Sequence, residues 1–331
     1  MEFPYPLLVC DVGGTNVRMG FWPVAGAEPI LLPTRRTADF PDFTGCLDEA
    51  ISGIGERPRS ILACGAGPVT GRQIRLTNAA WTLEGPQTAY RLGLSQGLLL
   101  NDFEAQALSL PVHRPEWLRP VGQALSAGEG PRIILGPGTG LGVAALIKDG
   151  TRYLSLASEA AHTEFAPENE TEWAIWQAAE RAHGRITAEA MVSGPGLVRL
   201  HKARAKIFGF SADLAGGPAL VAAAKIEPSG PAGDTLRHFW KLVARLSGDL
   251  ALTFGARGGV TLSGGILPQI TDFLDPENFR QTFEAKAPMG DLLRKISVQL
   301  LEAENAALFG MAAIAARPQN YLIDYEARAW R

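Results

Sequence analysis

The chain has 331 residues, a length that predicts two lobes. Of these residues 46% are hydrophobic and 20% are charged, which is enough apolar content for a sizeable core. The net charge of -3 excludes the basic surface expected of a nucleic-acid-binding protein. No apolar run reaches the ~20 residues of a membrane span. The three cysteines form no paired motif, which favours a cytoplasmic protein. The densest basic run, on a predicted helix, is interpreted as a solvated face: Lys202, Arg204 and Lys206.

A Gly-Gly turn between two apolar runs opens the chain. Leu7–Asp11 and Val17–Trp22 are predicted strands, joined by the turn VGGTN at residues 12–16. Because a strand follows the glycines, the pattern predicts a hairpin and not a Walker or Rossmann loop. Its N–H groups and the Thr15 hydroxyl would form an anion site for phosphate, and Asp11 would hold Mg²⁺ through water. The alternative is a plain hairpin with a surface aspartate.

The apolar run Leu98–Leu100 ends abruptly in Asn101 and Asp102, and a helical segment at residues 103–110 follows. A buried strand that stops at a carboxylate places this group at the strand's carboxyl end, where open α/β sheets bind ligands. The alternative is that Asn101 or Asp102 caps the following helix. Asn78 also follows a short predicted strand and is a further candidate for ligand contact.

A second glycine hairpin begins the later part of the chain. Ile133–Leu135 and Val143–Ile147 are predicted strands, and the turn between them is rich in glycine. Two copies of one phosphate-binding hairpin imply a duplicated fold that closes on a nucleotide from both sides. Gly264 and Gly265 follow another apolar strand, and a helix is predicted from Ile266. Glycines at this point allow a flat ring or a phosphate to approach the backbone.

Three polar residues between these glycine segments suit a polyol. Glu159 and His162 are three residues apart, so both reach one ligand if the segment is turned or helical. Carboxylates accept hydrogen bonds from sugar hydroxyls, and imidazole either donates or accepts. Glu189 is a further candidate acceptor, with an ordinary surface glutamate as the alternative. The HxE sequence that begins at His162 is typical of zinc deaminases, but no PCxxC follows it, which excludes that class.

The chain resembles the bacterial glucokinase family, in the hexokinase/actin-like ATPase superfamily, in six ordered motifs: DVGGTN, LNDFEAQ, GPGTGLG, SEAAHTEFAP, MVSGPGLV and LSGGILP. The resemblance extends to about residue 317. It implies a two-lobed α/β fold of the actin-like ATPase (ribonuclease H-like) type, with duplicated domains, a cleft between them and a homodimeric assembly. The small lobe would comprise residues 1–112 and the C-terminal part at about 303–331, and the large lobe residues 113–302. The zinc motif of the related ROK branch is missing.

The resemblance also implies the reaction, which is ATP-dependent phosphorylation of glucose at the 6-hydroxyl. Asp102 would be the general base that takes the proton from this hydroxyl. The other hydroxyls would be held by a set of polar residues: Asn78, Asn101, Glu159, His162 and Glu189. ATP would lie against the glycine segments, and Asp11 would organise Mg²⁺. The residues implied for ATP are Gly13, Gly14, Thr15 and Asn16 on one side of the phosphates, Gly138 and Thr139 on the other, and Gly264 and Gly265 against adenosine.

One motif departs from the family pattern. The sugar loop, commonly Gly-Glu-Gly-Gly-His, is Ser-Glu-Ala-Ala-His at residues 158–162, so two methyl groups replace hydrogens. The glutamate and the histidine keep their places. Three alternative functions are a kinase for another hexose (fructose, mannose or an amino sugar), a non-catalytic sugar sensor, and an actin-like ATPase that acts on protein partners. The last would leave the polyol-facing residues unexplained.

Overall fold

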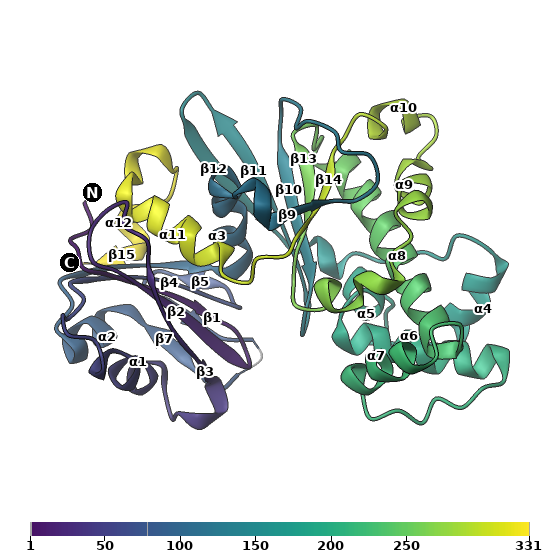
Figure 1. Cartoon of the computed structure of the whole chain (residues 1–331), viewed down its shortest axis with the longest axis horizontal. Helices are drawn as coiled ribbons and strands as arrows, with labels where there is room; N and C mark the ends of the chain where they lie inside the picture. Colours follow the sequence, from purple (N-terminus) through teal and green to yellow (C-terminus); the bar gives the residue numbers. More distant parts are fainter. Residues whose placement is uncertain (1, 78, 331) are drawn as a thin grey trace. The chain divides into compact units, whose positions relative to one another are not determined.

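The computed structural model describes residues 2–77 and 79–330. Asn78, one of the predicted sugar-binding residues, lies outside the described residues. The chain divides into two compact units and contains two six-stranded mixed sheets (Figure 1). Helices and strands alternate along both, so the predicted α/β class is confirmed.

The first unit comprises Met1–Arg114, Leu146–Ala157 and Ala303–Arg331, and the second comprises Pro115–Ala145 and Ser158–Glu302. The predicted division instead places Leu146–Ala157 in the large lobe, at residues 113–302. The strands are β1 (Leu7–Val12), β2 (Asn16–Trp22), β3 (Ile30–Arg36), β4 (Ser60–Gly65), β5 (Val69–Thr70), β6 (Gln73–Arg75), β7 (Thr82–Glu84), β8 (Gln96–Asn101), β9 (Leu118–Pro120), β10 (Arg132–Pro137), β11 (Leu141–Asp149), β12 (Arg152–Ser158), β13 (Gly259–Leu262), β14 (Val298–Leu301) and β15 (Ala329–Trp330). The α-helices are α1 (Phe43–Ser52), α2 (Gly85–Leu92), α3 (Asp102–Ser109), α4 (Glu170–Ala178), α5 (Ala188–Met191), α6 (Gly194–Phe208), α7 (Gly217–Ile226), α8 (Pro231–Thr253), α9 (Pro276–Glu284), α10 (Gly290–Leu293), α11 (Ala306–Ala316) and α12 (Tyr325–Arg328). Short 3₁₀ segments are η1 (Thr37–Asp39), η2 (Leu110–Val112), η3 (Pro115–Trp117), η4 (Ala160–His162), η5 (Leu267–Phe273) and η6 (Pro318–Asn320).

The sheet of the first unit has the order β15-β8-β4-β1-β2-β3. Strands β1, β4 and β8 are parallel, so their carboxyl ends lie at one edge of the sheet. Helices α1 and α2 cover one face, and α3 and α11 cover the other (Figure 1). Because both faces are covered, the central strands are continuous apolar runs with buried side chains. This packing places the Asp11 and Asn101 ends of β1 and β8 at the same edge.

The C-terminal segment completes this sheet. Strand β15 pairs antiparallel with β8, and the Trp330 side chain is buried. A Cβ atom added at Gly97 would lie 2.1 Å from the Trp330 indole, and one added at Gly85 would lie 2.4 Å from it. Glycine at both positions therefore makes room for the ring. The Arg328 guanidinium also forms an ion pair with Glu104, at 2.6 Å. The chain's last turn therefore fixes the strand and helix that carry Asn101 and Asp102.

The second sheet has the order β12-β11-β10-β13-β14-β9, and its strands β10, β13, β14 and β9 lie in the second unit. Strands β10, β13 and β14 are parallel, whereas β9 runs antiparallel to β14. Helix α8 is the long central helix of this unit, and its apolar face packs into the core beside α9. The helix predicted from Ile266 is the 3₁₀ segment η5. Pro268 there has no N–H to donate, and Ile270 leaves helical dihedral angles (φ -120°, ψ 19°).

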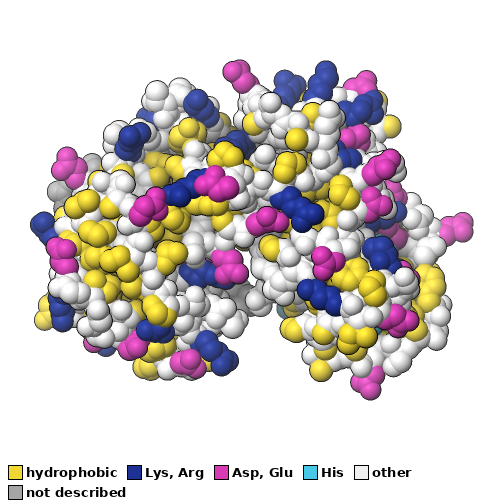
Figure 2. Space-filling model, viewed as in Figure 1, with side chains coloured by type: hydrophobic (Ala, Val, Ile, Leu, Met, Phe, Trp, Pro, Cys, Tyr) yellow, Lys and Arg dark blue, Asp and Glu magenta, His cyan; other side chains and the backbone are white. Residues whose placement is uncertain are grey.

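The surface carries mixed charge. On the face shown in Figure 2, the cationic and anionic side chains of the described residues are interspersed and form no continuous basic field. In the part of the chain that the structure describes, every helix is too short or too polar to cross a bilayer.

Candidate active site

The first glycine turn is a tight hairpin, as predicted. The Gly13 N–H donates to the Asn16 carbonyl at 2.9 Å. Thr37 holds the turn from outside, because its N–H donates to the Thr15 carbonyl at 2.9 Å and its hydroxyl donates to the Gly13 carbonyl at 3.2 Å. Neither Gly13 nor Gly14 has a positive φ, so the turn is not an anion nest of the αR–αL type. The side chain of Thr15 is exposed at its tip.

Asp11 lies at the end of β1 and pairs with Arg18 across the hairpin. Arg18 Nη1 is 4.0 Å from Asp11 Oδ2, and Arg18 Nη2 donates to Glu304 Oε2 at 3.3 Å. The Cys64 thiol on β4 donates to Asp11 Oδ1 at 3.4 Å. Burial raises the pKa of Asp11, and both Arg18 and Cys64 oppose this shift. Neither Arg18 nor Cys64 is among the residues that the sequence predicts for the site. The antiparallel register about the Gly-Gly turn was a signal for Arg18, because it pairs Arg18 with Asp11.

Asn101 is both the last residue of β8 and the N-cap of α3. Its Oδ1 accepts hydrogen bonds from the N–H groups of Phe103 at 3.0 Å and Glu104 at 3.1 Å. The Glu104 carboxylate accepts in return from the Asn101 N–H at 3.3 Å, which completes a capping box. The amide Nδ2 donates to the Gly67 carbonyl at 3.1 Å. The capping interpretation is therefore confirmed for Asn101.

Asp102 lies one residue beyond the cap, as the first residue of α3, and its side chain is only half-buried. Burial of the carboxyl group raises its pKa, and the negative charge of Asp11 raises it further. Hydrogen bonds from the N–H groups of Phe103 and of Asp102 itself, and from the Asn101 side chain, lower it, and the result is a pKa of about 7. A carboxyl group that is accessible and titrates near neutral pH is suited to accept a proton from a substrate.

The second glycine turn lies between β10 and β11. The Gly138 N–H donates to the Gly140 carbonyl at 2.7 Å, which leaves Thr139 exposed at the tip. The Gly138 carbonyl accepts from the N–H of Gly194, the first residue of α6, at 2.8 Å. This turn is therefore anchored to the start of a long helix.

Gly264 and Gly265 lie beside this second turn. Gly264 has a φ of +89°, and a Cβ there would lie 2.4 Å from the Pro137 carbonyl oxygen. Its neighbour Gly265 is held through its carbonyl, which accepts from Gln269 Nε2 at 2.7 Å. The two glycine segments predicted to contact the nucleotide in this unit are thus packed against each other.

Gly136 is another point of close approach between the two segments. A Cβ at Gly136 would lie 2.7 Å from the backbone carbon of Ser263 and 2.9 Å from the Gly264 nitrogen. Gly136→Ala is expected to destabilise the protein by about 1–3 kcal/mol, because backbone must move to admit the methyl group. Gly138→Ala is the matched control, since a Cβ there meets nothing within 4 Å. Chemical unfolding monitors both, and equal midpoints for the two variants would refute the prediction.

Glu159 and His162 lie on one exposed turn. Glu159 precedes η4, and its Oε2 is 3.6 Å from His162 Nε2, so the predicted proximity of the two is confirmed. The Ala161 methyl group is buried in the core of this unit, and the Ala160 N–H donates to Ser158 Oγ at 3.1 Å. Ala161 therefore packs inward and Ala160 stays in the turn, while the glutamate and histidine side chains remain accessible.

Glu189 lies in the short helix α5 and supports the second glycine turn. Its Oε2 accepts from the Leu141 N–H at 2.9 Å, and a Cβ at Gly140 would lie 2.6 Å from this oxygen. The Ala188 N–H donates to the Thr163 carbonyl at 3.0 Å, which joins α5 to the segment after η4. Glu189 is thus close in the structure both to the glycine turn and to the Glu159–His162 segment. Only one of its carboxylate oxygens is needed for the backbone contact.

A buried ion network holds the chain that follows this segment. Glu172 is 2% exposed, and its carboxylate accepts from Arg245 Nη1 at 2.5 Å and lies 3.3 Å from His238 Nε2. The Arg245 guanidinium also lies 4.4 Å from the Phe165 ring centroid. Burial by itself would raise the pKa of Glu172, but hydrogen bonds from His238 and Arg245 outweigh it and lower this pKa to about 2. Motif analysis missed this network because its members are far apart in sequence.

The described residues contain no cluster of three or more His, Cys, Asp and Glu side chains that would enclose a metal ion. Mg²⁺ commonly binds one or two carboxylates and takes its remaining ligands from water and substrate phosphates. The half-buried Asp11 carboxylate, beside a hairpin at the edge of the sheet, fits this kind of site.

Comparison with known proteins assigns the fold and the family. A profile of the Glucokinase family matches residues 8–318. The glucokinase of Sinorhizobium medicae is 36% identical over 331 residues, which cover 100% of this chain and 98% of that protein. The crystal structure of a glucokinase from an Antarctic psychrotroph has a TM-score of 0.81 at 27% identity, covering 95% of this chain and 100% of that one. A ROK family glucokinase from Streptomyces griseus, in complex with glucose and AMPPNP, has a TM-score of 0.64 at 21% identity, covering 94% and 99%.

These structural similarities confirm the predicted fold, the mixed α/β fold of the actin-like sugar kinases. Within this class, the family profile and the full-length relatives decide the assignment. The chain belongs to the glucokinase family.

Proposed function

We propose that this protein is an ATP-dependent glucokinase that converts glucose to glucose 6-phosphate, with Asp102 as the general base. Membership of the family supports glucose and ATP as substrates. The observation that carries the mechanism is the Asp102 carboxyl group, which is accessible at the end of β8 and has a pKa raised to about 7. A base with this pKa is about half ionised at pH 7 and is still strong enough to take a hydroxyl proton.

The proposed reaction is an in-line phosphoryl transfer. The sugar 6-hydroxyl donates a hydrogen bond to the Asp102 carboxylate, and its oxygen attacks the γ-phosphorus as its proton passes to Asp102. The bond from the γ-phosphorus to the bridging oxygen breaks, and ADP leaves with that electron pair. Catalysis of this kind depends mainly on positioning and on stabilising the charge of the transferred group.

The other site residues are proposed to bind and orient the substrates. Their backbone N–H groups and side chains would neutralise the phosphates or hold the sugar. Mg²⁺ held at Asp11 through water would supply the positive charge that offsets the triphosphate. The sugar hydroxyls would be held by Asn78, Asn101, Glu159, His162 and Glu189, and ATP by Gly13, Gly14, Thr15, Asn16, Gly138, Thr139, Gly264 and Gly265.

The test is an ADP-release assay with Mg-ATP and a panel of hexoses, beside a control without sugar. We expect turnover with glucose to exceed turnover with fructose, mannose and glucosamine, and little hydrolysis without sugar. Preference for another hexose would favour the alternative kinase. Absence of turnover with every sugar would favour a sensor, and sugar-independent hydrolysis would favour a partner-driven ATPase. A homodimer and a cytoplasmic location are proposed as well, and light scattering of the purified protein tests the first.

The raised pKa of Asp102 predicts a pH dependence of catalysis. Only the ionised carboxylate accepts a proton, so kcat/KM for glucose is expected to fall about tenfold between pH 8 and pH 6. Steady-state rates across this range measure the effect, with tryptophan fluorescence to show that the protein stays folded. A flat profile down to pH 5.5 would contradict the assignment of Asp102 as the base.

A further inference from the structure

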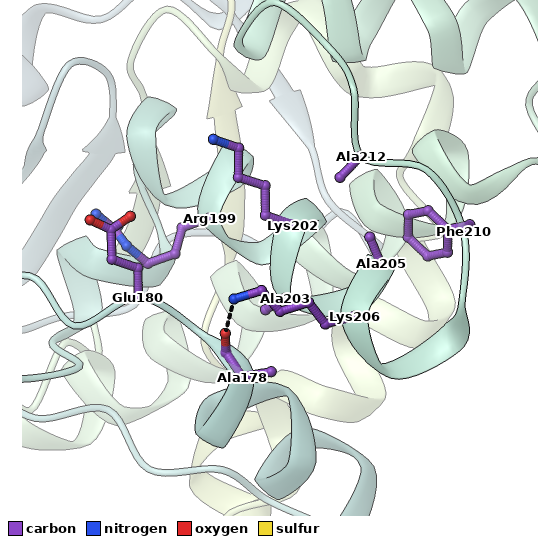
Figure 3. Close-up of a pocket in the computed structure, with 9 residues that line it drawn as sticks. All are labelled: Ala178, Glu180, Arg199, Lys202, Ala203, Ala205, Lys206, Phe210 and Ala212. Atoms are coloured by element: carbon purple, nitrogen blue, oxygen red, sulfur yellow. Dashed lines mark hydrogen bonds between the residues drawn. The ribbon is translucent and has the colours of Figure 1, made fainter.

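A cavity of about 420 Å³ in the second unit lies among residues to which the proposed reaction assigns no role (Figure 3). It is formed by the end of α4, one face of α6 and the segment that follows α6. Four charged side chains line it, together with Phe210 and the methyl groups of alanines. The charged residues are Glu180, Arg199, Lys202 and Lys206. The volume is within the range of small-molecule sites, about 300–1,000 Å³.

Helical periodicity brings the three cations of this cavity together. Arg199, Lys202 and Lys206 are spaced i, i+3 and i+7 on α6, so they lie along one face of the helix. Arg204, which belongs to the same basic run in the sequence, does not line the cavity, and its guanidinium lies 5.1 Å from the Phe208 ring centroid. The sequence predicts a solvated face for this basic run, and Lys202 and Lys206 are exposed, as predicted, while both also line the cavity.

Among the described residues, these cations keep hydrogen-bond donors that no other protein group accepts. The Arg199 guanidinium is fixed by the Ala190 carbonyl, to which Nη1 donates at 2.5 Å, while its buried Nε has no hydrogen-bond partner. Lys206 Nζ donates to the Ala178 carbonyl at 3.1 Å, which uses one of its three hydrogens (Figure 3). Among the described residues, the Lys202 ammonium has neither a hydrogen-bond nor an ion-pair partner. With one carboxylate, Glu180, the lining has a net charge of about +2.

The cavity also has an apolar side. In the view of Figure 3, the charged head groups lie on one side of α6, whereas Phe210, Ala205 and Ala212 lie on the other. The Phe210 ring is half-buried and packs against His201, with their ring centroids 5.2 Å apart. A ligand that fits both sides has a compact double negative charge joined to a small body with apolar C–H surface.

We propose that this cavity binds a phosphate monoester with a small sugar body. A phosphate dianion matches the net charge of the lining, and its oxygens are acceptors for the Lys202 and Lys206 ammonium groups. The sugar C–H groups lie against Phe210 and the alanines. The site is independent of the proposed function, since it uses none of the residues assigned to glucose, ATP or Mg²⁺.

The test is isothermal titration calorimetry of the full chain with ribose 5-phosphate, a sugar phosphate that is not a product of the proposed reaction. Inorganic phosphate and ribose are the two partial ligands. We expect ribose 5-phosphate to bind more tightly than phosphate, and ribose to give no measurable heat. Lys202→Met and Lys206→Met are each expected to raise the Kd of ribose 5-phosphate at least about tenfold, because each removes a charged donor to phosphate.

Lys225→Met, an exposed lysine on α7 that does not line the cavity, is the matched control and should leave the Kd unchanged. Lys202→Met is the safer of the two test variants for folding, because the exposed Lys202 holds no other group in place. An unchanged Kd in both test variants would place binding elsewhere and overturn the proposal. Equal affinity for phosphate and ribose 5-phosphate, equal affinity for ribose and ribose 5-phosphate, or no binding of ribose 5-phosphate to the unmodified protein would overturn it as well.

Discussion

Asp102→Asn is expected to lower kcat by about 10²–10⁴-fold, while the Kd for glucose changes by less than about tenfold. The substitution keeps the size of the side chain and its place at the start of α3, but an amide does not accept the 6-hydroxyl proton. Coupled ADP release measures kcat, and calorimetry measures the binding of glucose. Asp48→Asn, at an exposed position on α1 of the same unit, is the control and should retain full activity. Near-normal turnover of Asp102→Asn would refute the role of Asp102 as the base.

The same variant should also differ from the unmodified protein in the pH dependence of its stability. The folded pKa of Asp102 is about 7, above the ordinary value of 3.8, so the folded state binds a proton more tightly than the unfolded state. Ionisation of Asp102 therefore destabilises the folded protein progressively as the pH rises from about 4 to about 7. Asp102→Asn removes this effect, and its advantage over the unmodified protein should be absent near pH 3.5. The advantage should grow to at most about 4 kcal/mol above pH 7. A loss of activity with this gain in stability distinguishes a catalytic role from misfolding.

Glu172→Ala is expected to destabilise the protein by about 3–5 kcal/mol, because it removes the nearer carboxylate of the buried Arg245 guanidinium and the hydrogen-bond partner of His238. The free energy of unfolding in urea measures the loss. Glu170→Ala, two residues away on the same helix and exposed, is the matched control and should change stability by less than about 0.5 kcal/mol. A loss below about 1 kcal/mol for Glu172→Ala would show that the ion network is not a structural element of this unit.

The pH dependence of this loss follows from the pKa of Glu172. Its folded pKa is about 2, below the ordinary 4.5, so the ionised carboxylate stabilises the fold above pH 4.5. This contribution disappears as the pH falls through the window between 4.5 and 2. The difference between the unmodified protein and Glu172→Ala should therefore shrink in that window. A difference that stays constant from pH 7 to pH 3 would contradict the lowered pKa.

Local patterns in the sequence were sufficient for the elements that carry the candidate site. The Gly-Gly turn at residues 13–14, with an apolar run on each side, predicts the β1–β2 hairpin because strand period and turn chemistry are both short-range. The Leu98–Leu100 run that stops at Asn101 predicts a strand end, and the structure places it at the same edge of the sheet as Asp11, with β4 between the two strands. The spacing of Glu159 and His162 likewise predicts that they are neighbours. In each case the information lies within about ten residues.

Long-range packing supplied what these patterns lacked. Asn101 caps its own helix through local hydrogen bonds, but the contact of its amide with the Gly67 carbonyl depends on the fold. The pKa of Asp102 is raised because folding buries it near Asp11. Glu172 and Arg245 are 73 residues apart in the sequence, and their pairing joins α4 to α8. Burial, pKa and ion pairing depend on which distant segments come together, and a local periodicity contains no information about that. The sequence was therefore sufficient to propose the candidate site residues, whereas their burial, their pKa shifts and their supporting contacts came from the fold.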